Sequence, residues 1–209
     1  MNRRTPLAVA LAIAGAVALA ACGGSSNAAR SSPSSASSGA TTGCKAPNPN
    51  TPESNPSGDI PDNQCYVAYS DAAGSFTVDV PEGWSRTNAG GVVTFTDKLN
   101  SIRLDVVAAA AAPTADTAAA LEVPAIEAAA KSYEAGKVST GTRTAGQAVL
   151  ITYKADSAPD AVTGKVIHLD VERYEFWRGG KEAILTLSGP VGADNVDPWK
   201  TVTDSFGWQ

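Results

Sequence analysis

Apolar and polar residues alternate along three stretches in the middle of the chain, as is typical of half-buried strands. These are Phe76–Val80, Val92–Thr96 and Ile102–Val106. Pro81-Glu-Gly-Trp84 and residues 97–100 carry the residues that turns prefer. We therefore expect three successive antiparallel strands, arranged as a meander.

The alanine-rich segment that follows predicts two helices. Residues 114–123 form the first, and Pro124 suits the start of the second, where its missing N–H has no partner to lose. Gly136 would end this second helix. Its apolar face, at helical spacing, would comprise Ile126, Ala129, Ala130 and Tyr133.

The second half of the chain returns to strand patterns and ends in a helix. We expect a hairpin from residues 138–144 and 147–153, and a second from 165–178 and 182–188 around Gly179-Gly180. Asp197 caps the last helix and Pro198 opens it. Its buried face would hold Trp199, Val202, Thr203 and Phe206. The fold class is α+β: an antiparallel sheet of six or seven strands with helices packed on one or both faces.

The N-terminal pattern is that of an export signal. Arg3 and Arg4 precede an uncharged apolar run that ends in Leu19-Ala-Ala-Cys22. The run is shorter than the about 20 apolar residues that span a bilayer. Leu-Ala-Ala-Cys matches the bacterial lipobox, which predicts acylation of Cys22 and a protein held on the extracytoplasmic face of the cell membrane. The alternative is an ordinary secreted protein in which Cys22 is discarded.

Composition divides the rest of the chain in two. Residues 22–64 are rich in Ser, Ala, Gly and Pro and show no periodicity, so we expect an acylated cysteine followed by a disordered tether. Residues 65–209 have the size and patterning of one domain. Removing residues 1–21 leaves 14 basic and 21 acidic residues, a net charge of −7 that disfavours binding to nucleic acid and to anionic head groups.

Two cysteines remain beside Cys22. In an oxidising compartment we expect Cys44 and Cys65 to form a disulfide that joins the proline-rich lead-in to the first strand. A redox or metal role would need closer spacing or more ligands.

The motifs Pro81–Trp84, Val93–Phe95 and Asn100–Ile102 resemble the opening of the PsbP-like fold, an α/β/α sandwich. The motifs Ala193–Asn195, Trp199 and Ser205–Phe206 resemble the ending of actinobacterial lipoproteins of the LpqN/LpqT family, which share that fold. The resemblance covers about residues 66–209. It implies an envelope adaptor or carrier, and no catalytic residue is transferred by it.

Candidate chemistry centres on His168, the only histidine. A strand would place His168, Asp170 and Glu172 on one face, where they could act as a general base or hold a cation. The alternative is a solvated polar strand face, with Ile167, Leu169 and Val171 turned to the core. We expect no cofactor, because Gly141–Gly146 lacks the lysine and hydroxyl of a phosphate loop and no nucleophile elbow occurs.

A small-faced helix beside a sheet could also leave a ligand groove. Its candidate lining is Trp84, Phe95, Ile126, Tyr133 and Trp177. We therefore expect a non-catalytic binding or adaptor module whose partner is an envelope membrane protein or lipid. The alternatives are an envelope-acting enzyme that uses His168 with Asp170 or Glu172, and a structural surface lipoprotein.

Overall fold

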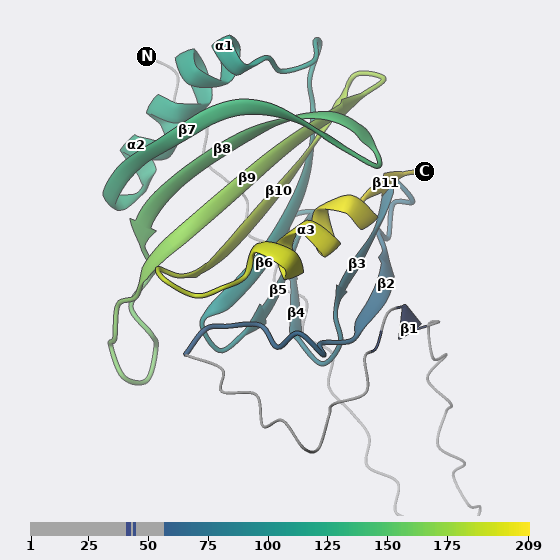
Figure 1. Ribbon diagram of the computed structural model, residues 1–209. Helices are drawn as coiled ribbons and strands as arrows, with labels where there is room; N and C mark the ends of the chain where they lie inside the picture. Colours follow the sequence, from purple (N-terminus) through teal and green to yellow (C-terminus); the bar gives the residue numbers. More distant parts are fainter. Residues whose placement is uncertain (1–40, 43, 45–56) are drawn as a thin grey trace, which may run out of the picture. The chain divides into compact units, whose positions relative to one another are not determined.

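Figure 1 shows the computed structural model, which describes residues 41–42, 44 and 57–209. Cys22, the expected signal segment 1–21 and most of the expected tether lie outside the described residues. Within the described part, no helix is long and apolar enough to cross a membrane.

Two antiparallel sheets form the framework (Figure 1). The smaller sheet has the order β1-β2-β3-β11. Its strands are β1 (Thr41–Thr42), β2 (Tyr66–Ser70), β3 (Phe76–Pro81) and β11 (Gly207–Trp208).

The larger sheet has the order β4-β5-β6-β10-β9-β8-β7. Its strands are β4 (Ser85–Ala89), β5 (Val92–Asp97), β6 (Asn100–Ala108), β7 (Lys131–Arg143), β8 (Gly146–Asp156), β9 (His168–Arg178) and β10 (Lys181–Pro190). The two expected hairpins are present, and Gly179 and Gly180 both have positive φ, as their tight turn requires.

The expected meander needs a correction. The strand at Phe76 pairs in the smaller sheet, and the meander of the larger sheet is β4-β5-β6. Sequence reading missed β4 because Ser85–Ala89 is exposed along its whole length and carries no apolar alternation. Its place in the sheet is set by pairing with β5.

The first helical region is one run of α1 (Ala115–Thr117), a π-helical turn η1 (Ala118–Glu122) and α2 (Val123–Ala129). The second expected helix therefore ends at Ala129, seven residues before Gly136. Ala130 has an extended backbone. Tyr133 lies in β7, where its ring packs against that of Tyr153 with the ring centroids 5.7 Å apart. Pairing with the long strand β8 outweighs the helical spacing of residues 130–136.

Helices cover both faces of the larger sheet, so the fold is α+β as expected (Figure 1). On one face, α3 (Val196–Ser205) buries Trp199 and Val202 in the main core. Phe206, the residue after α3, is also in this core and stacks on Phe176 of β9, with the ring centroids 4.7 Å apart. On the opposite face, Ala118 packs against β8 in a smaller apolar cluster.

The folded unit begins earlier than Cys65, the expected start of the domain. Ile60 is 4% exposed and lies in the main core. Its N–H donates to the Asn195 side chain at 2.8 Å. Residues 57–64, which composition placed in the tether, therefore belong to the folded unit.

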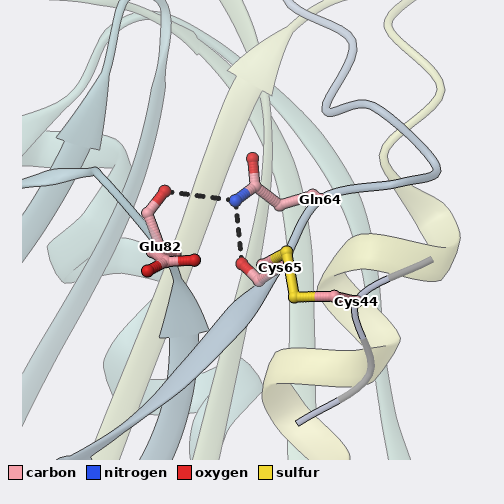
Figure 2. Close-up of a disulfide and its surroundings, with 4 residues drawn as sticks. All are labelled: Cys44, Gln64, Cys65 and Glu82. Atoms are coloured by element: carbon pink, nitrogen blue, oxygen red, sulfur yellow. Dashed lines mark hydrogen bonds between the residues drawn. A yellow bond between two sulfur atoms is a disulfide. The ribbon is translucent and has the colours of Figure 1, made fainter. Parts of the chain in front are cut away.

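The expected Cys44–Cys65 disulfide is present (Figure 2). Beside it, the Gln64 amide donates to the carbonyl oxygens of Cys65 and Glu82, at 2.8 Å and 3.2 Å. The N–H of Glu82 also donates to the Cys65 carbonyl. The disulfide thus joins the lead-in to the start of β2, at the turn that follows β3.

Candidate functional site

A groove of about 470 Å³ lies between strands β7–β9 and the N-terminal part of α3. We call it the α3 groove. Its sheet side includes Glu134, Thr152, Lys154, Asp170 and Glu172, and its helix side includes Ala193, Val196 and Trp199.

A bulge in β7 shapes one rim of the α3 groove. The register of β7 on β8 shifts between Ala135 and Val138. A Cβ at Gly136 would lie 2.2 Å from the carbonyl oxygen of Thr152, so only glycine permits this approach of the two backbones. The Thr152 hydroxyl accepts from the N–H of Lys137 at 2.9 Å. Such bulges often reshape a sheet next to a site.

The charges on the sheet side follow from strand register. Glu172 and Asp170 of β9 lie opposite Thr152 and Lys154 of β8. Lys154 in turn lies opposite Glu134 of β7. Cross-strand partners lie on the same face of a sheet. The groove therefore gathers three carboxylates and a single ammonium group, so it attracts positively charged groups.

Trp199 closes the groove on the helix side. Its side chain is 7% exposed, and its indole Nε1 has no hydrogen-bond partner among the described residues. A buried indole N–H ordinarily donates to an acceptor. At the lip, Val196 is 69% exposed.

A chain of hydrogen bonds fixes Glu172 in place. The Tyr174 hydroxyl donates to Glu172 at 2.9 Å and accepts from Arg143 at 2.7 Å. Burial, and then the Glu172 carboxylate, raise the pKa of Tyr174 to about 12, so the hydroxyl stays protonated at neutral pH. The Arg143 Nε donates to the Thr203 hydroxyl at 3.0 Å, which ties this end of the sheet to α3.

His168 contacts residues other than those the sequence suggested. Its Nδ1 lies 2.9 Å from Asp156, and its Nε2 lies 3.3 Å from Glu134. Asp170 and Glu172 lie on the same strand but have other neighbours. Sequence reading missed Asp156 and Glu134 because the contacts depend on the register of β7, β8 and β9.

The order of groups around His168 differs from that of a hydrolase triad. The Ser132 hydroxyl donates to Asp156 at 2.5 Å, and both ring nitrogens of His168 face carboxylates. That Ser132 bond, and then the bond from His168, lower the pKa of Asp156. A triad instead places the serine hydroxyl against the histidine, with the carboxylate behind it.

The five residues proposed from sequence for a groove lie in different places. Phe95 is buried in the main core, with its ring 5.2 Å from that of Tyr69, and Trp84 packs at the edge of that core beside residues 57–64. Ile126 and Tyr133 lie on the opposite face, near Ala118 and against Tyr153. Trp177 donates to the carbonyl of Ala109 at 2.9 Å. The structure does not bring these five side chains together.

Among the described residues, one group of potential metal ligands lies close together. The trio with ligand atoms within 4.8 Å of one another is Cys44, Cys65 and Glu82, shown in Figure 2. Both sulfurs of this trio are bonded to each other, and a disulfide does not supply the thiolates that a metal requires. Cys44 and Cys65 therefore act here as a structural disulfide and not as metal ligands.

No protein-family model matches the chain, and no curated protein matches it in sequence. Solved structures do. A protein from Bacteroides thetaiotaomicron VPI-5482 aligns over 68% of this chain, with a TM-score of 0.47 and 12% identity, and the chain spans 48% of that protein's length. The Saccharomyces cerevisiae Ran-binding protein Mog1p aligns over 68% of this chain and 95% of its own, with a TM-score of 0.47 and 10% identity.

Cyanobacterial PsbP (CyanoP) from Synechocystis sp. PCC 6803 gives a stronger likeness. Its solution structure aligns over 69% of this chain and 92% of its own length, with a TM-score of 0.51 and 16% identity. Like the architecture described above, this likeness concerns the fold. The chain has a PsbP-like α+β fold.

Proposed function

We propose that this protein is a lipid-anchored, extracytoplasmic binding module of the LpqN/LpqT kind, which acts as an adaptor for a partner in the cell envelope. The anchor is Cys22, proposed from the lipobox and its preceding apolar run. Two or more acyl chains on one cysteine would hold the protein at the membrane without an apolar patch on the folded domain.

The α3 groove is the proposed docking site, and its occupant is a basic, extended segment of a partner protein. The observation that carries this proposal is the pairing of an acidic sheet side with the buried Trp199 indole. Lysine or arginine side chains would meet Glu134, Asp170 and Glu172, and a peptide carbonyl could accept from the indole N–H.

The same composition disfavours an acyl chain in this groove. Glu172 and Lys154 lie within it, and covering charged groups with hydrocarbon carries a large desolvation cost. The lipid partner that the sequence left open is therefore the weaker candidate here. The membrane contact in this proposal is the anchor alone.

A short-peptide titration tests the docking site. Isotope-labelled protein, as purified from the cell, is titrated with a lysine-rich pentapeptide and with a glutamate-rich pentapeptide of the same length. Backbone NMR shifts should move around Asp170, Val196 and Trp199 with the basic peptide only. Asp170→Lys should weaken this binding about tenfold or more, because it replaces attraction with repulsion. Equal binding of both peptides would refute the charge argument.

The anchor has a separate test. Mass spectrometry of the N-terminal peptide of the native protein should show an acylated Cys22, and Cys22→Ser should release the protein from the membrane fraction. An unmodified N-terminus elsewhere in the chain would contradict the anchor and leave the groove proposal standing on its own test.

The enzymatic alternative has one geometric observation in its favour, the 2.9 Å contact between His168 and Asp156. A carboxylate at Nδ1 orients the histidine in many active sites. His168→Ala then gives a direct discrimination. Loss of the cellular phenotype with peptide binding unchanged would favour the enzyme, whereas an intact phenotype would exclude it.

A further inference from the structure

A second pocket, of about 200 Å³, lies on the face of the larger sheet opposite the α3 groove. We call it the η1 pocket, since the π-helical turn forms one side of it. Its walls are small or apolar, and include Ala111, Pro113, Ala118 and Leu121. Three carboxylates also line it, those of Glu122, Glu175 and Glu182.

Glu175 is the central feature of this pocket. Its side chain is 0% exposed, and its cross-strand neighbours on β8 and β10 are Val149 and Ile184. One carboxylate oxygen, Oε1, accepts from the Arg173 Nε at 2.8 Å. The other, Oε2, is buried without a hydrogen-bond partner among the described residues. An unpaired buried carboxylate oxygen is costly, and a donor placed beside it would be strongly held.

The pocket has fewer positively charged groups than carboxylates. Arg173 serves two carboxylates, since its Nη2 also donates to Glu122 at 2.9 Å. Burial raises the pKa of Glu175 and also that of Glu182, and for Glu182 the neighbouring Glu175 and Glu122 add to the effect. With all three acids ionised, the pocket would carry a net charge of −2 around a single guanidinium.

The π-helical turn η1 forms one wall of this pocket. In η1 the N–H of Val123 donates to the carbonyl of Ala118, five residues back. Pro124 has no N–H and would crowd the carbonyl four residues before it in a regular α-helix, so the wider turn suits it. On the other side, the Trp177 indole fixes the loop that leads to Pro113 by donating to Ala109. Single π-helical turns are frequent at functional sites.

A divalent metal ion fits this pocket poorly. Calcium takes six to eight oxygen ligands and magnesium takes six. In the described part of the chain, the three carboxylates do not bring their oxygens within the 4.8 Å that a shared ion requires. An ammonium group needs fewer and less regular contacts, and its three N–H donors suit separate carboxylate oxygens.

We infer that the η1 pocket binds a primary alkylammonium group, with the nitrogen near Glu175 and Glu182 and the alkyl chain against Leu121 and the alanines. A free amine and a lysine side chain share this chemistry. The inference does not depend on the α3 groove, because the two sites lie on opposite faces of the sheet.

The test uses wild-type protein and three probes: n-butylammonium, butan-1-ol, and the lysine amide blocked at both ends. NMR titration of the isotope-labelled protein should give saturable shifts at residues 111–122 and at Glu175 with the two ammonium probes, and none with butanol. Tighter binding of the blocked lysine would assign a side chain of another protein, and tighter binding of butylammonium a free amine.

Variants then separate charge from shape. Glu175→Gln and Glu182→Gln should each weaken butylammonium binding about tenfold or more, since each removes a charge-assisted hydrogen bond. Glu127→Gln, at an exposed position of α2 outside the pocket, is the matched control and should leave binding unchanged. Equal affinity for butanol and butylammonium would overturn the inference, as would no saturable binding of either ammonium probe. If Glu175→Gln does not fold, Glu182→Gln and the wild-type comparison still decide the matter.

Discussion

Asn195 shows how one buried polar side chain can hold three parts of the chain together. It is 2% exposed, accepts from the N–H of Ile60, and donates to Gly58 and to the Asn100 side chain. Asn100 in turn donates to Gly58 at 2.9 Å. Residues 58–60, the start of β6 and the start of α3 are therefore joined by one hydrogen-bond network.

Asn195→Ala should destabilise the fold by about 3 kcal/mol, because Ile60 and Asn100 each lose a partner in a buried setting. Chemical denaturation measures the change. The control is Asn88→Ala on the exposed strand β4, which should shift stability by no more than about 0.5 kcal/mol. Equal effects of the two substitutions would show that the network contributes nothing.

Glu175 should make stability depend on pH. Its pKa is raised in the folded state by burial, so the folded protein holds this proton more tightly than the unfolded chain, in which glutamate has a pKa of about 4.3. The contribution of Glu175 to stability is therefore greatest below that pH and falls as pH rises through the folded-state pKa.

Urea unfolding curves recorded from acidic to neutral pH test this directly. Glu175→Gln should flatten the decline with rising pH, whereas Glu127→Gln, on the exposed side of α2, should preserve it. A wild-type slope that Glu175→Gln leaves unchanged would disprove the assignment.

Individual residues differ in how far sequence could place them. The Cys44–Cys65 pair followed from the cysteine count and the expected oxidising compartment, and the burial of Trp199, Val202 and Phe206 followed from helical spacing. The neighbours of His168 did not, because Asp156 and Glu134 reach it from two other strands. A contact across strands needs the register, and periodicity alone does not supply one.

At the scale of elements, the bulge of β7 depends on one glycine. Gly136→Ala should destabilise the protein by about 2–3 kcal/mol, since the added methyl group would collide with the backbone of Thr152. Gly141→Ala on the same strand is the matched control. Its Cβ would meet nothing within 4 Å, so alanine there should be neutral or stabilising by up to about 1 kcal/mol.

Thermal or chemical unfolding of both variants measures the difference. Gly136→Ala should also change the NMR shifts along the rim of the α3 groove, near Glu134 and Thr152. Two alanine variants of equal stability would contradict the close approach described for the bulge.

Elements with strict alternation were predicted well, and those without it were not. β3, β5, β6 and the two hairpins followed from period two and from glycine turns. β4 has no apolar side, and the first part of β7 has helical spacing, so both were misassigned. In each case pairing with a neighbouring strand decided the structure, and that information is not local in sequence.

At the scale of the whole molecule, the disulfide joins the lead-in to the domain over a sequence separation of 21. In the chain-entropy model a loop of this size stabilises the fold by roughly 3 kcal/mol. Cys44→Ser with Cys65→Ser should lose about that much. Dithiothreitol should reduce the stability of the wild type by a similar amount and leave the double variant unchanged. A double variant as stable as the wild type would mean that the disulfide does not stabilise the fold.

The two proposed binding sites lie on opposite faces of the larger sheet. The α3 side carries the main core and a groove suited to a basic segment, and the helical side carries a small acidic pocket. The α+β class predicted from the sequence is confirmed, but the predicted groove was placed at five residues that lie apart. The locations of both sites depend on which strands are adjacent, and the seven-stranded order was not readable from local pattern.

The most direct test of the proposed function is photo-crosslinking in living cells from one position at the α3 groove and one position outside both proposed sites. Val196 at the α3 groove is 69% exposed, and the control position, Val162 in the loop between β8 and β9, is 93% exposed. A photoreactive residue at Val196 should give a discrete adduct with an envelope protein, the crosslinked peptide should be rich in lysine or arginine, and Asp170→Lys should abolish the adduct. Adducts of the same kind and yield from both positions, or none from Val196 in membranes that retain the protein, would contradict the account.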